Sequence, residues 1–296
     1  MTMPRIPSEP TPSAALEASY HAMQRAKRPA RTLTAGLFLA ALAVSFVVGE
    51  IDLQRLGEGL PKALAYVTGT FPVLRTETLG ADLGEWYWGL NYWLRLLAET
   101  ILMAFVGTVF GVFAGLVLCF PASRNLVQST VIYFVARRLL EVARTVPTLV
   151  YALIFVFAFG LGPFAGVLAI AVHTAGSLGK LFSEANENVA PGPIEGVRAA
   201  GGTWAMVMRL GVVPQVLPIY ASYALLRFEI NVRSASVLGI VGAGGIGEEL
   251  YLAVRQFEYP DISAILLLII AVVCCIDLAC EAVRRGLIGG ERSAHA

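Results

Sequence analysis

The side chains most able to do chemistry gather in one apolar segment, residues 213–236. If this segment is a helix, with about 100° per residue, one face carries an arginine, two tyrosines, an amide and a hydroxyl: Tyr220, Tyr223, Arg227, Asn231 and Ser234. Arg227 has no obvious partner in its own segment and lies among hydroxyl and amide donors. That setting suits transient contact with a tetrahedral oxyanion, because a guanidinium group binds such anions through charge-assisted hydrogen bonds. An interhelical salt bridge is the alternative for Arg227.

A second face of the same segment carries opposite charges and hydroxyls: Ser222, Glu229, Arg233 and Ser236. Glu229 and Arg233 are four residues apart and can pair on one helix. We expect this pair to be mainly structural.

Basic side chains in two neighbouring apolar segments are further candidates for a functional site. Ionisable groups are costly within membrane spans, so each is a functional candidate by default. One helical face in and just after residues 163–183 holds His173, Ser177, Lys180 and Glu184, of which the last two are near enough to the cytoplasm to be solvated. His173 could line a pathway or could be a hydrogen-bonded packing residue. Arg144 and Thr145, just before Pro147, could line the pathway where the helix bends, with anchoring at the membrane surface as the alternative.

These segments belong to a strongly apolar chain. Of its 296 residues 57% are hydrophobic and 15% are charged, and the mean hydropathy is +0.70, which excludes an ordinary soluble domain. A net charge of +1 argues against nucleic-acid binding, which rests on phosphate neutralisation. The four cysteines form no CxxC pair and have no histidine at ligand spacing. We therefore expect no metal or cofactor in this chain.

Six segments are long and apolar enough to cross about 30 Å of hydrocarbon as helices. They are 32–49, 96–120, 130–160, 163–183, 213–236 and 262–283. The third is too long for a simple span and its first half is charged, so we place that half at the cytoplasmic surface, with a kink near Pro147. The sequence thus predicts an all-α, polytopic membrane helical bundle of about six spans.

Lysine and arginine indicate the orientation, because positively charged segments are retained in the cytoplasm. With the N-terminus inside, the outer segments hold only Arg55, Lys62, Arg75, Arg95 and Arg255, so both termini are expected in the cytoplasm. The expected organisation is a basic, flexible N-terminus (1–31), a first helix with an external segment (32–95), the membrane domain (96–285) and a cytoplasmic tail (286–296).

Two glycine patterns have structural interpretations. Gly107, Gly111 and Gly115 recur every four residues and leave one helix face open to close packing, within the subunit or at a dimer seam. GAGGIG at 242–247 matches a dinucleotide-binding pattern, but it follows a membrane helix and lacks the βαβ context, so we expect a loop. The chain also lacks a GxxxxGK[ST] phosphate loop, so any ATP must be hydrolysed by another subunit and we expect no enzyme activity here.

Residues 191–214, PGPIEGVRAAGGTWAMVMRLGVVP, form a segment with recognisable helix signals. Pro193 suits a first helical position, and Gly201 and Gly202 end that helix. Thr203 can cap a second helix that leads into Pro214. Two short helices that meet at a glycine turn would make a compact knob on the cytoplasmic side, and we call residues 191–214 the knob.

The knob resembles the signature loop of ABC importer transmembrane subunits, which has Glu-Ala-Ala, a glycine and a distant proline. Glu195, Gly201 and Pro214 stand at that family's spacing. The departures from its pattern agree with the narrower phosphonate-importer permease family: Gly196, Val197, Gly211 and Val213. The resemblance covers about residues 95–285 and also rests on EGVRAAGG, HTAGSLGKLFSEA, SYALLRFEINVRSASVLGIVGAGGIG and GLGPFAGVLA.

The resemblance implies the type I ABC importer fold and a permease of the bacterial inner membrane that works by alternating access. It implies a second copy of the chain, two ATPase subunits that use ATP and Mg²⁺, and an external binding protein that delivers a phosphonate or related phosphorus oxyanion. The knob would dock on the ATPase through its coupling residues, Glu195, Ala199, Ala200, Gly201 and Pro214. Together with the polar faces above, the expected pathway residues are Arg144, His173, Tyr223, Arg227, Asn231 and Ser234.

Two alternatives are open at the level of sequence. An importer of the same class could carry methionine or another small nutrient. An autonomous secondary transporter or channel could use the same buried charges as an ion path, but it would show inverted repeats and discontinuous helices, which we do not find in the sequence.

Overall fold

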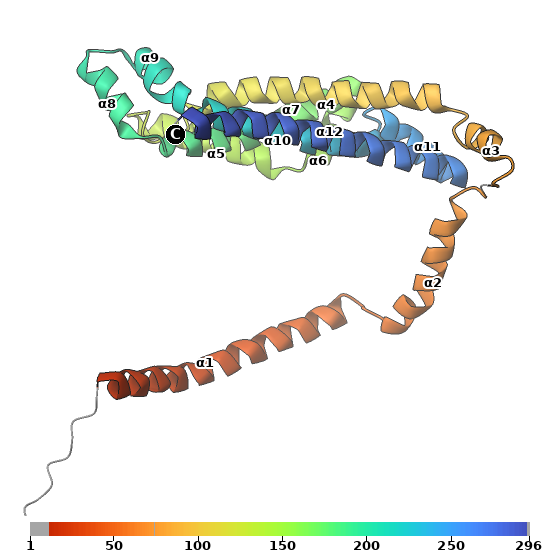
Figure 1. Ribbon diagram of the computed structural model, residues 1–296, viewed down its shortest axis with the longest axis horizontal. Helices are drawn as coiled ribbons and strands as arrows, with labels where there is room; N and C mark the ends of the chain where they lie inside the picture. The colour runs from red at the N-terminus through yellow and green to blue at the C-terminus, as the bar shows by residue number, and fades with distance from the viewer. Residues whose placement is uncertain (1–11, 74, 295–296) are drawn as a thin grey trace, which may run out of the picture. The chain divides into compact units, whose positions relative to one another are not determined.

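The computed structural model describes residues 12–73 and 75–294, and every regular element in those ranges is helical (Figure 1). The chain divides into two compact units, Met1–Val67 and Thr68–Ala296, which are described separately. The expectation of an all-α membrane protein is thereby confirmed.

The first unit contains helix α1 (Pro12–Val48) and most of helix α2 (Leu53–Gly69). Within α1, residues 31–48 are long and apolar enough to span a membrane, as expected for 32–49. Helix α1 begins at Pro12, inside the segment 1–31 for which the sequence suggested flexibility. The alanine, leucine, methionine, glutamine and lysine residues between 14 and 27 are good helix formers. Residues 1–11 lie outside the described residues.

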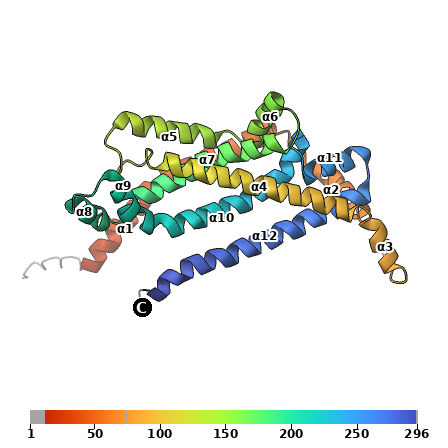
Figure 2. The ribbon, with the colours of Figure 1, turned by 90° about the horizontal axis from the view of Figure 1, so that it is seen from above.

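The second unit is a bundle built around two long helices, α4 (Leu90–Cys119) and α7 (Pro163–Glu187). Helix α10 (Val213–Leu238) packs against both, and α12 (Tyr259–Ala294) packs against α10 (Figure 2). Helix α4 begins before the predicted residue 96, and α12 continues past the predicted residue 283. Hydropathy identifies only the apolar part of a helix, whereas backbone hydrogen bonding continues into its polar ends.

Close packing of α4 on α7 depends on three glycines of α4. A Cβ atom at Gly107 would lie 2.8 Å from the Ile170 side chain, and one at Gly111 would lie 2.5 Å from Thr174 Cβ. A Cβ atom at Gly115 would lie 3.0 Å from the backbone nitrogen of Gly179. The interpretation of this glycine pattern as a packing face within the subunit is confirmed, since small residues let membrane helices approach closely.

The third predicted span is broken, as expected. Helices α5 (Thr130–Thr145) and α6 (Thr148–Phe159) meet at Val146 and Pro147 with a bend of 89°. Proline cannot continue the hydrogen-bond ladder of the preceding helix, which explains the position of the break. Among the described residues five helices pass the length and hydropathy test for a span, and this bent pair passes it as a sixth.

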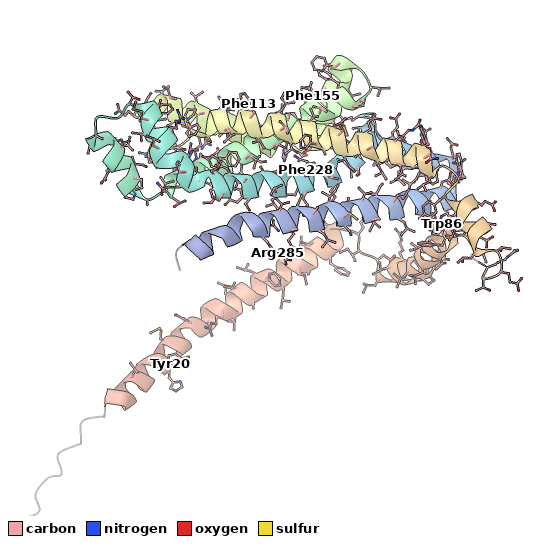
Figure 3. The ribbon with its side chains drawn as sticks, turned by 45° about the horizontal axis from the view of Figure 1, so that its top comes forward. Tyr20, Trp86, Phe113, Phe155, Phe228 and Arg285 are labelled. Atoms are coloured by element: carbon pink, nitrogen blue, oxygen red, sulfur yellow. The ribbon has the colours of Figure 1, made fainter. Side chains whose placement is uncertain are left out.

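The sides of the bundle are apolar, as a lipid-facing surface requires. A groove of about 720 Å³ between α4, α10 and α12 is lined almost entirely by apolar side chains, including Phe105, Phe113 and Phe228 (Figure 3). Such a surface suits lipid tails or another membrane helix.

One end of the second unit holds α3 (Leu79–Trp86), α11 (Ile246–Gln256) and the start of α12 (Figures 1 and 2). Trp86 Nε1 donates hydrogen bonds to Pro260 O at 3.0 Å and Ser263 Oγ at 3.1 Å. Ser263 Oγ donates to Thr70 O at 2.7 Å. Thr70 and Trp86 therefore pack against the start of α12, far along the chain from the segment 32–95 in which the sequence analysis placed them. Hydropathy cannot reveal contacts between residues so far apart in the chain.

The GAGGIG sequence forms a packed loop between the short helix η2 (Gly239–Val241) and α11. Gly242, Gly244 and Gly245 have φ near +80°, a conformation that glycine adopts without strain. Residues 243–247 are buried, and Thr100 Oγ1 accepts a hydrogen bond from the Ile246 backbone at 2.9 Å. Cβ atoms at Gly242 and Gly245 would clash with the side chains of Leu161 and Thr100, so these glycines pack against protein and the loop interpretation is confirmed.

Candidate functional site

The knob occupies the opposite end of the second unit, where α12 also ends (Figures 1 and 2). It contains α8 (Pro191–Ala199), α9 (Trp204–Met206) and a π-helical turn, η1 (Val207–Val212), which leads into α10. The sequence predicted Pro193 as the first residue of this helix, but α8 begins two residues earlier, at Pro191. Because Pro191 already supplies the fixed φ and the missing N–H that a first position tolerates, Pro193 falls within the first turn.

The glycine turn of the knob is as the sequence predicted. Gly201 has a φ of +79°, and its backbone N–H donates to Arg198 O at 2.9 Å. The backbone N–H of Gly202 donates to Val197 O at 2.9 Å. Thr203 Oγ1 then caps the second helix by accepting from the Met206 backbone at 3.4 Å.

The knob is anchored to the bundle by one buried side chain of α8. Ile194 is buried and packs in a core with Val207, Val212 and Phe182. Gly211 permits this packing, because a Cβ atom there would lie 3.3 Å from the Ile194 Cα atom. Ile194 therefore joins the knob to the core that lies beneath it.

The predicted coupling residues lie on the outside of the knob. Glu195, Ala199, Ala200, Gly201 and Pro214 are all exposed. Three small residues beside one carboxylate make a surface that another protein can approach closely. The role of these residues in coupling stays a prediction.

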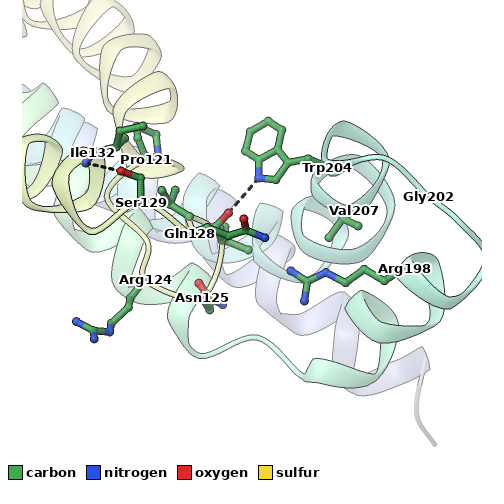
Figure 4. Close-up of a pocket in the computed structure, with 12 residues that line it drawn as sticks. Pro121, Arg124, Asn125, Gln128, Ser129, Ile132, Arg198, Gly202, Trp204 and Val207 are labelled. Carbon is green, nitrogen blue, oxygen red and sulfur yellow. Dashed lines mark hydrogen bonds between the residues drawn. The ribbon is translucent and has the colours of Figure 1, made fainter.

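A cleft of about 970 Å³ separates the knob from the connection between α4 and α5 (Figure 4). Arg198, Gln128 and Ser129 contribute polar groups to its lining. Trp204 Nε1 bridges the two walls by donating to Leu126 O at 3.1 Å.

Three of the predicted pathway residues come together near the bend between α5 and α6. Arg227 of α10 is partly buried, Arg144 of α5 is exposed, and the two lie near enough for their charges to interact. Arg227 also interacts electrostatically with His173 of α7. We call Arg144, His173 and Arg227 the basic cluster.

His173 also holds the bend itself. Its Nδ1 atom lies 3.1 Å from Val146 O, the last carbonyl before Pro147. That carbonyl has no helical partner, because the ladder stops at the proline. The packing role considered for His173 is therefore present, and the pathway role stays a prediction alongside it.

Within the described part of the chain, neither arginine of the basic cluster has an ion-pair partner. Their neighbours do: Arg137 pairs with Glu187 at 2.9 Å, Arg138 with Glu141 at 2.6 Å, and Lys180 with Glu141 at 3.4 Å. The pairs of Arg137 with Glu187 and of Lys180 with Glu141 join α5 to α7, whereas the pair of Arg138 with Glu141 lies within α5. The interhelical salt bridge considered for Arg227 is absent from the described residues.

The other predicted pathway residues differ in their surroundings. Asn231 is buried, and its amide donates to Thr108 Oγ1 at 2.8 Å and Thr174 Oγ1 at 2.9 Å, which ties α10 to α4 and α7. Ser234 Oγ donates to Ile230 O at 3.0 Å. Tyr223 is partly exposed, one helical turn before Arg227, and lines a small cleft between α7 and α10. The structure thus gives Asn231 a packing role and leaves Tyr223 accessible.

One partner of the second polar face of α10 could not be identified from that segment alone. Arg233 pairs with Glu229 at 3.4 Å, as predicted, and also with Asp277 of α12 at 3.3 Å. Asp277 lies inside the apolar segment 262–283 and was the available signal, because a carboxylate there is costly without a partner.

Comparison with known proteins gives a family match. Residues 107–287 match the model of the family described as "Binding-protein-dependent transport system inner membrane component". The phosphite transport system permease protein PtxC of Stutzerimonas stutzeri is 40% identical over 241 residues, 81% of this chain and 83% of the relative. The putative phosphite transport system permease protein HtxC of the same organism is 36% identical over 267 residues, 90% of each chain.

Solved structures agree on the fold. The MetNI methionine ABC transporter, in inward-facing conformations, matches with a TM-score of 0.57 and 23% identity over 66% of this chain and 95% of that chain. A bacterial ABC transporter involved in import of the acidic polysaccharide alginate matches with a TM-score of 0.59 and 14% identity, over 87% of this chain and 98% of that chain. The expected fold of an ABC importer permease is confirmed.

Proposed function

The chain belongs to the family of binding-protein-dependent transport system inner membrane components, and from this premise we propose that it carries a phosphorus oxyanion into the cell. It is a multi-pass inner-membrane permease, a translocation subunit and not an enzyme. Phosphonate, phosphite, phosphate and phosphate esters share the tetrahedral anionic group that this proposal requires. The phosphite permeases among its relatives support this class of substrate.

The single observation that carries the proposal is the basic cluster. Two guanidinium groups near a helix break in the membrane domain lie within electrostatic range of each other and have no carboxylate partner among the described residues. Unpaired charge is costly where a guanidinium group is partly buried, as at Arg227, so an anion that binds there stabilises the arrangement. A tetrahedral oxyanion offers several acceptors for guanidinium groups.

The proposed complex contains a second copy of this chain, two ATPase subunits and an external binding protein. ATP and Mg²⁺ would be bound by the ATPase subunits, which would dock on the exposed knob. Closure of the ATPase dimer would displace the knobs and open the cavity outward; hydrolysis would return it to the inward-open state. The basic cluster lies on α5, α7 and α10, so movement of these helices would change its exposure.

The proposal is tested by uptake into proteoliposomes that contain the chain, its ATPase and its binding protein. Arg144→Gln and Arg227→Gln should each lower uptake of labelled phosphite by about tenfold or more, because charged hydrogen bonds to an anion are lost. Arg138→Gln is the matched control on α5, since Glu141 already neutralises that arginine at the surface. It should change uptake by no more than about twofold.

Thermal unfolding of the same variants separates a pathway role from a structural one. Removing one of two repelling charges should leave the unfolding temperature unchanged or raised, although uptake falls. Lower stability together with normal uptake would show that Arg227 is a packing residue and would remove the observation that carries the proposal.

Methionine import is the second candidate, because a probable D-methionine transport system permease of Vibrio cholerae is 25% identical over 209 residues. Methionine has no tetrahedral oxyanion and would not need two unpaired arginines. Competition in the same assay distinguishes the candidates. Unlabelled phosphite or phosphonate should compete with labelled phosphite, whereas competition by methionine alone would favour the second candidate.

A further inference from the structure

A buried polar network lies directly beneath the knob, where three helices of the bundle meet. It contains Cys119 at the end of α4, Ser123 just after it, Asn186 on α7 and Tyr220 on α10. These residues are 4% exposed or less. Polar groups so deeply buried in an apolar core are costly unless they are hydrogen-bonded.

Each polar group of the network has a partner. Tyr220 Oη donates to Asn186 Oδ1 at 2.6 Å, and Asn186 Nδ2 donates to Ser123 Oγ at 3.2 Å. Ser123 Oγ donates to Cys119 O at 2.7 Å. Cys119 Sγ lies 3.6 Å from both Tyr220 Oη and Asn186 Nδ2. One chain of hydrogen bonds therefore joins α10 to α7 and α7 to the end of α4.

The network is continuous with the anchor of the knob. The rings of Tyr220 and Phe182 pack with their centroids 4.0 Å apart, in the same core that contains Ile194 and Val212. Tyr220 follows the π-helical turn η1 by about two helical turns. A π-helical turn is a weak point in a helix and often marks a functional site.

The Tyr220 hydroxyl is not needed to fill space. Phenylalanine at this position would keep the ring contact with Phe182. It would lose the short hydrogen bond to Asn186 and the longer contacts of Oη with Phe182 O at 3.5 Å and Cys119 Sγ at 3.6 Å. The bond instead fixes how α10 lies against α7. These two helices carry Arg227 and His173, so their relative position also sets the geometry of the basic cluster.

We propose that Tyr220 is a positioning residue that couples the knob to the basic cluster, by holding α10, α7 and the end of α4 together as one body beneath η1. This inference rests on the proposed function, because it assumes that an ATPase displaces the knob. Without the bond, displacement of the knob is absorbed at the start of α10 and only part of it reaches α7.

The test compares Tyr220→Phe with the wild-type chain in proteoliposomes that contain the ATPase and the binding protein. ATP hydrolysis and substrate uptake are measured in one preparation, and their ratio reports coupling. A buried hydrogen bond biases an equilibrium about fivefold, so ATP consumed per substrate should rise by up to about fivefold, while ATPase co-purification is unchanged.

Tyr151→Phe is the matched control. Its ring stacks on Phe155, and among the described residues its hydroxyl makes no hydrogen bond. It should leave the ratio unchanged. Ser123→Ala removes the acceptor of Asn186 and should also raise the amount of ATP consumed per substrate. Combined with Tyr220→Phe it should add little, because both changes break the same network.

An unchanged ratio in Tyr220→Phe, or equal losses of hydrolysis and uptake, would overturn the inference. If Tyr220→Phe fails to assemble, the decision rests on Ser123→Ala, and a normal ratio in that variant overturns the inference. Amide hydrogen exchange of the purified chain needs neither ATPase nor substrate, and the start of α10 should exchange about fivefold faster in Tyr220→Phe. Failure of the wild-type chain to move any phosphorus oxyanion would instead refute the proposed function.

Discussion

Replacing Gly111 by alanine should separate α4 from α7 at the centre of the bundle. The new Cβ atom would lie 2.5 Å from Thr174 Cβ and 3.0 Å from Ala171 O. Carbon atoms in contact are about 3.5 Å apart, so one of the helices must retreat by about 1 Å. Ala171 O is a backbone atom, and it cannot move without moving α7.

The cost follows from these contacts. Overpacking a well-packed core costs about 1–3 kcal/mol. Displacement of Thr174 also weakens its hydrogen bond with the Asn231 amide, 2.9 Å long, which contributes about 1 kcal/mol more. We therefore expect Gly111→Ala to destabilise the chain by about 2–4 kcal/mol, and to lower its unfolding temperature by roughly 5 to 15 °C.

Thermal unfolding of the purified chain in detergent measures this effect. Gly286→Ala is the matched control, because a Cβ atom at that position of α12 meets no atom within 4 Å. There the better helix propensity of alanine should leave stability unchanged or raise it by up to about 1 kcal/mol. Equal stability of Gly111→Ala and the wild-type chain would refute the close packing of α4 on α7.

Two further predictions concern the two ends of the second unit. Glu195→Arg should leave membrane insertion intact but abolish co-purification of the ATPase. Glu248→Arg, at the opposite end, is the control and should retain the ATPase. Retention of the ATPase by Glu195→Arg would remove the coupling assignment. Burial raises the pKa of Glu249 above its ordinary value of 4.5, and Asp261 and other nearby carboxylates raise it further. A hydrogen bond from Tyr92 opposes this shift. The stability of the wild-type chain should therefore fall as the pH rises from about 4.5 through the raised pKa. Glu249→Gln should remove this pH dependence and be more stable than the wild-type chain at pH 7. Identical pH profiles of the unfolding temperature in the two proteins would contradict this assignment.

The sequence could predict the features of the fold that depend on local pattern. Apolar length predicted the spans, and Pro147 predicted the break in the third. Gly201, Gly202 and Thr203 predicted the turn of the knob, because a positive φ and a helix cap each require particular residue types. Helix ends were less accurate, since α4 begins six residues before the predicted 96.

Contacts between distant residues could not be predicted in this way. The partners of Asn231 are Thr108 and Thr174, on two other helices, so its packing role emerges only from the fold. Asp277 is a similar case, because its pairing with Arg233 depends on how α12 crosses α10. For Arg227 the sequence suggested a cation without a partner, and the structure adds its proximity to Arg144.

The central claim is that the chain is the membrane subunit of an ATP-driven importer. The most direct test is to purify the tagged chain from its native membranes in a mild detergent and to identify the co-purifying proteins by mass spectrometry. We predict recovery of a P-loop ATPase in amounts equal to the permease, with no other permease chain. A second, different permease in equal amount would replace the second copy in the proposed complex. Repeated recovery of this chain alone, under conditions that preserve a known ABC complex, would contradict the account.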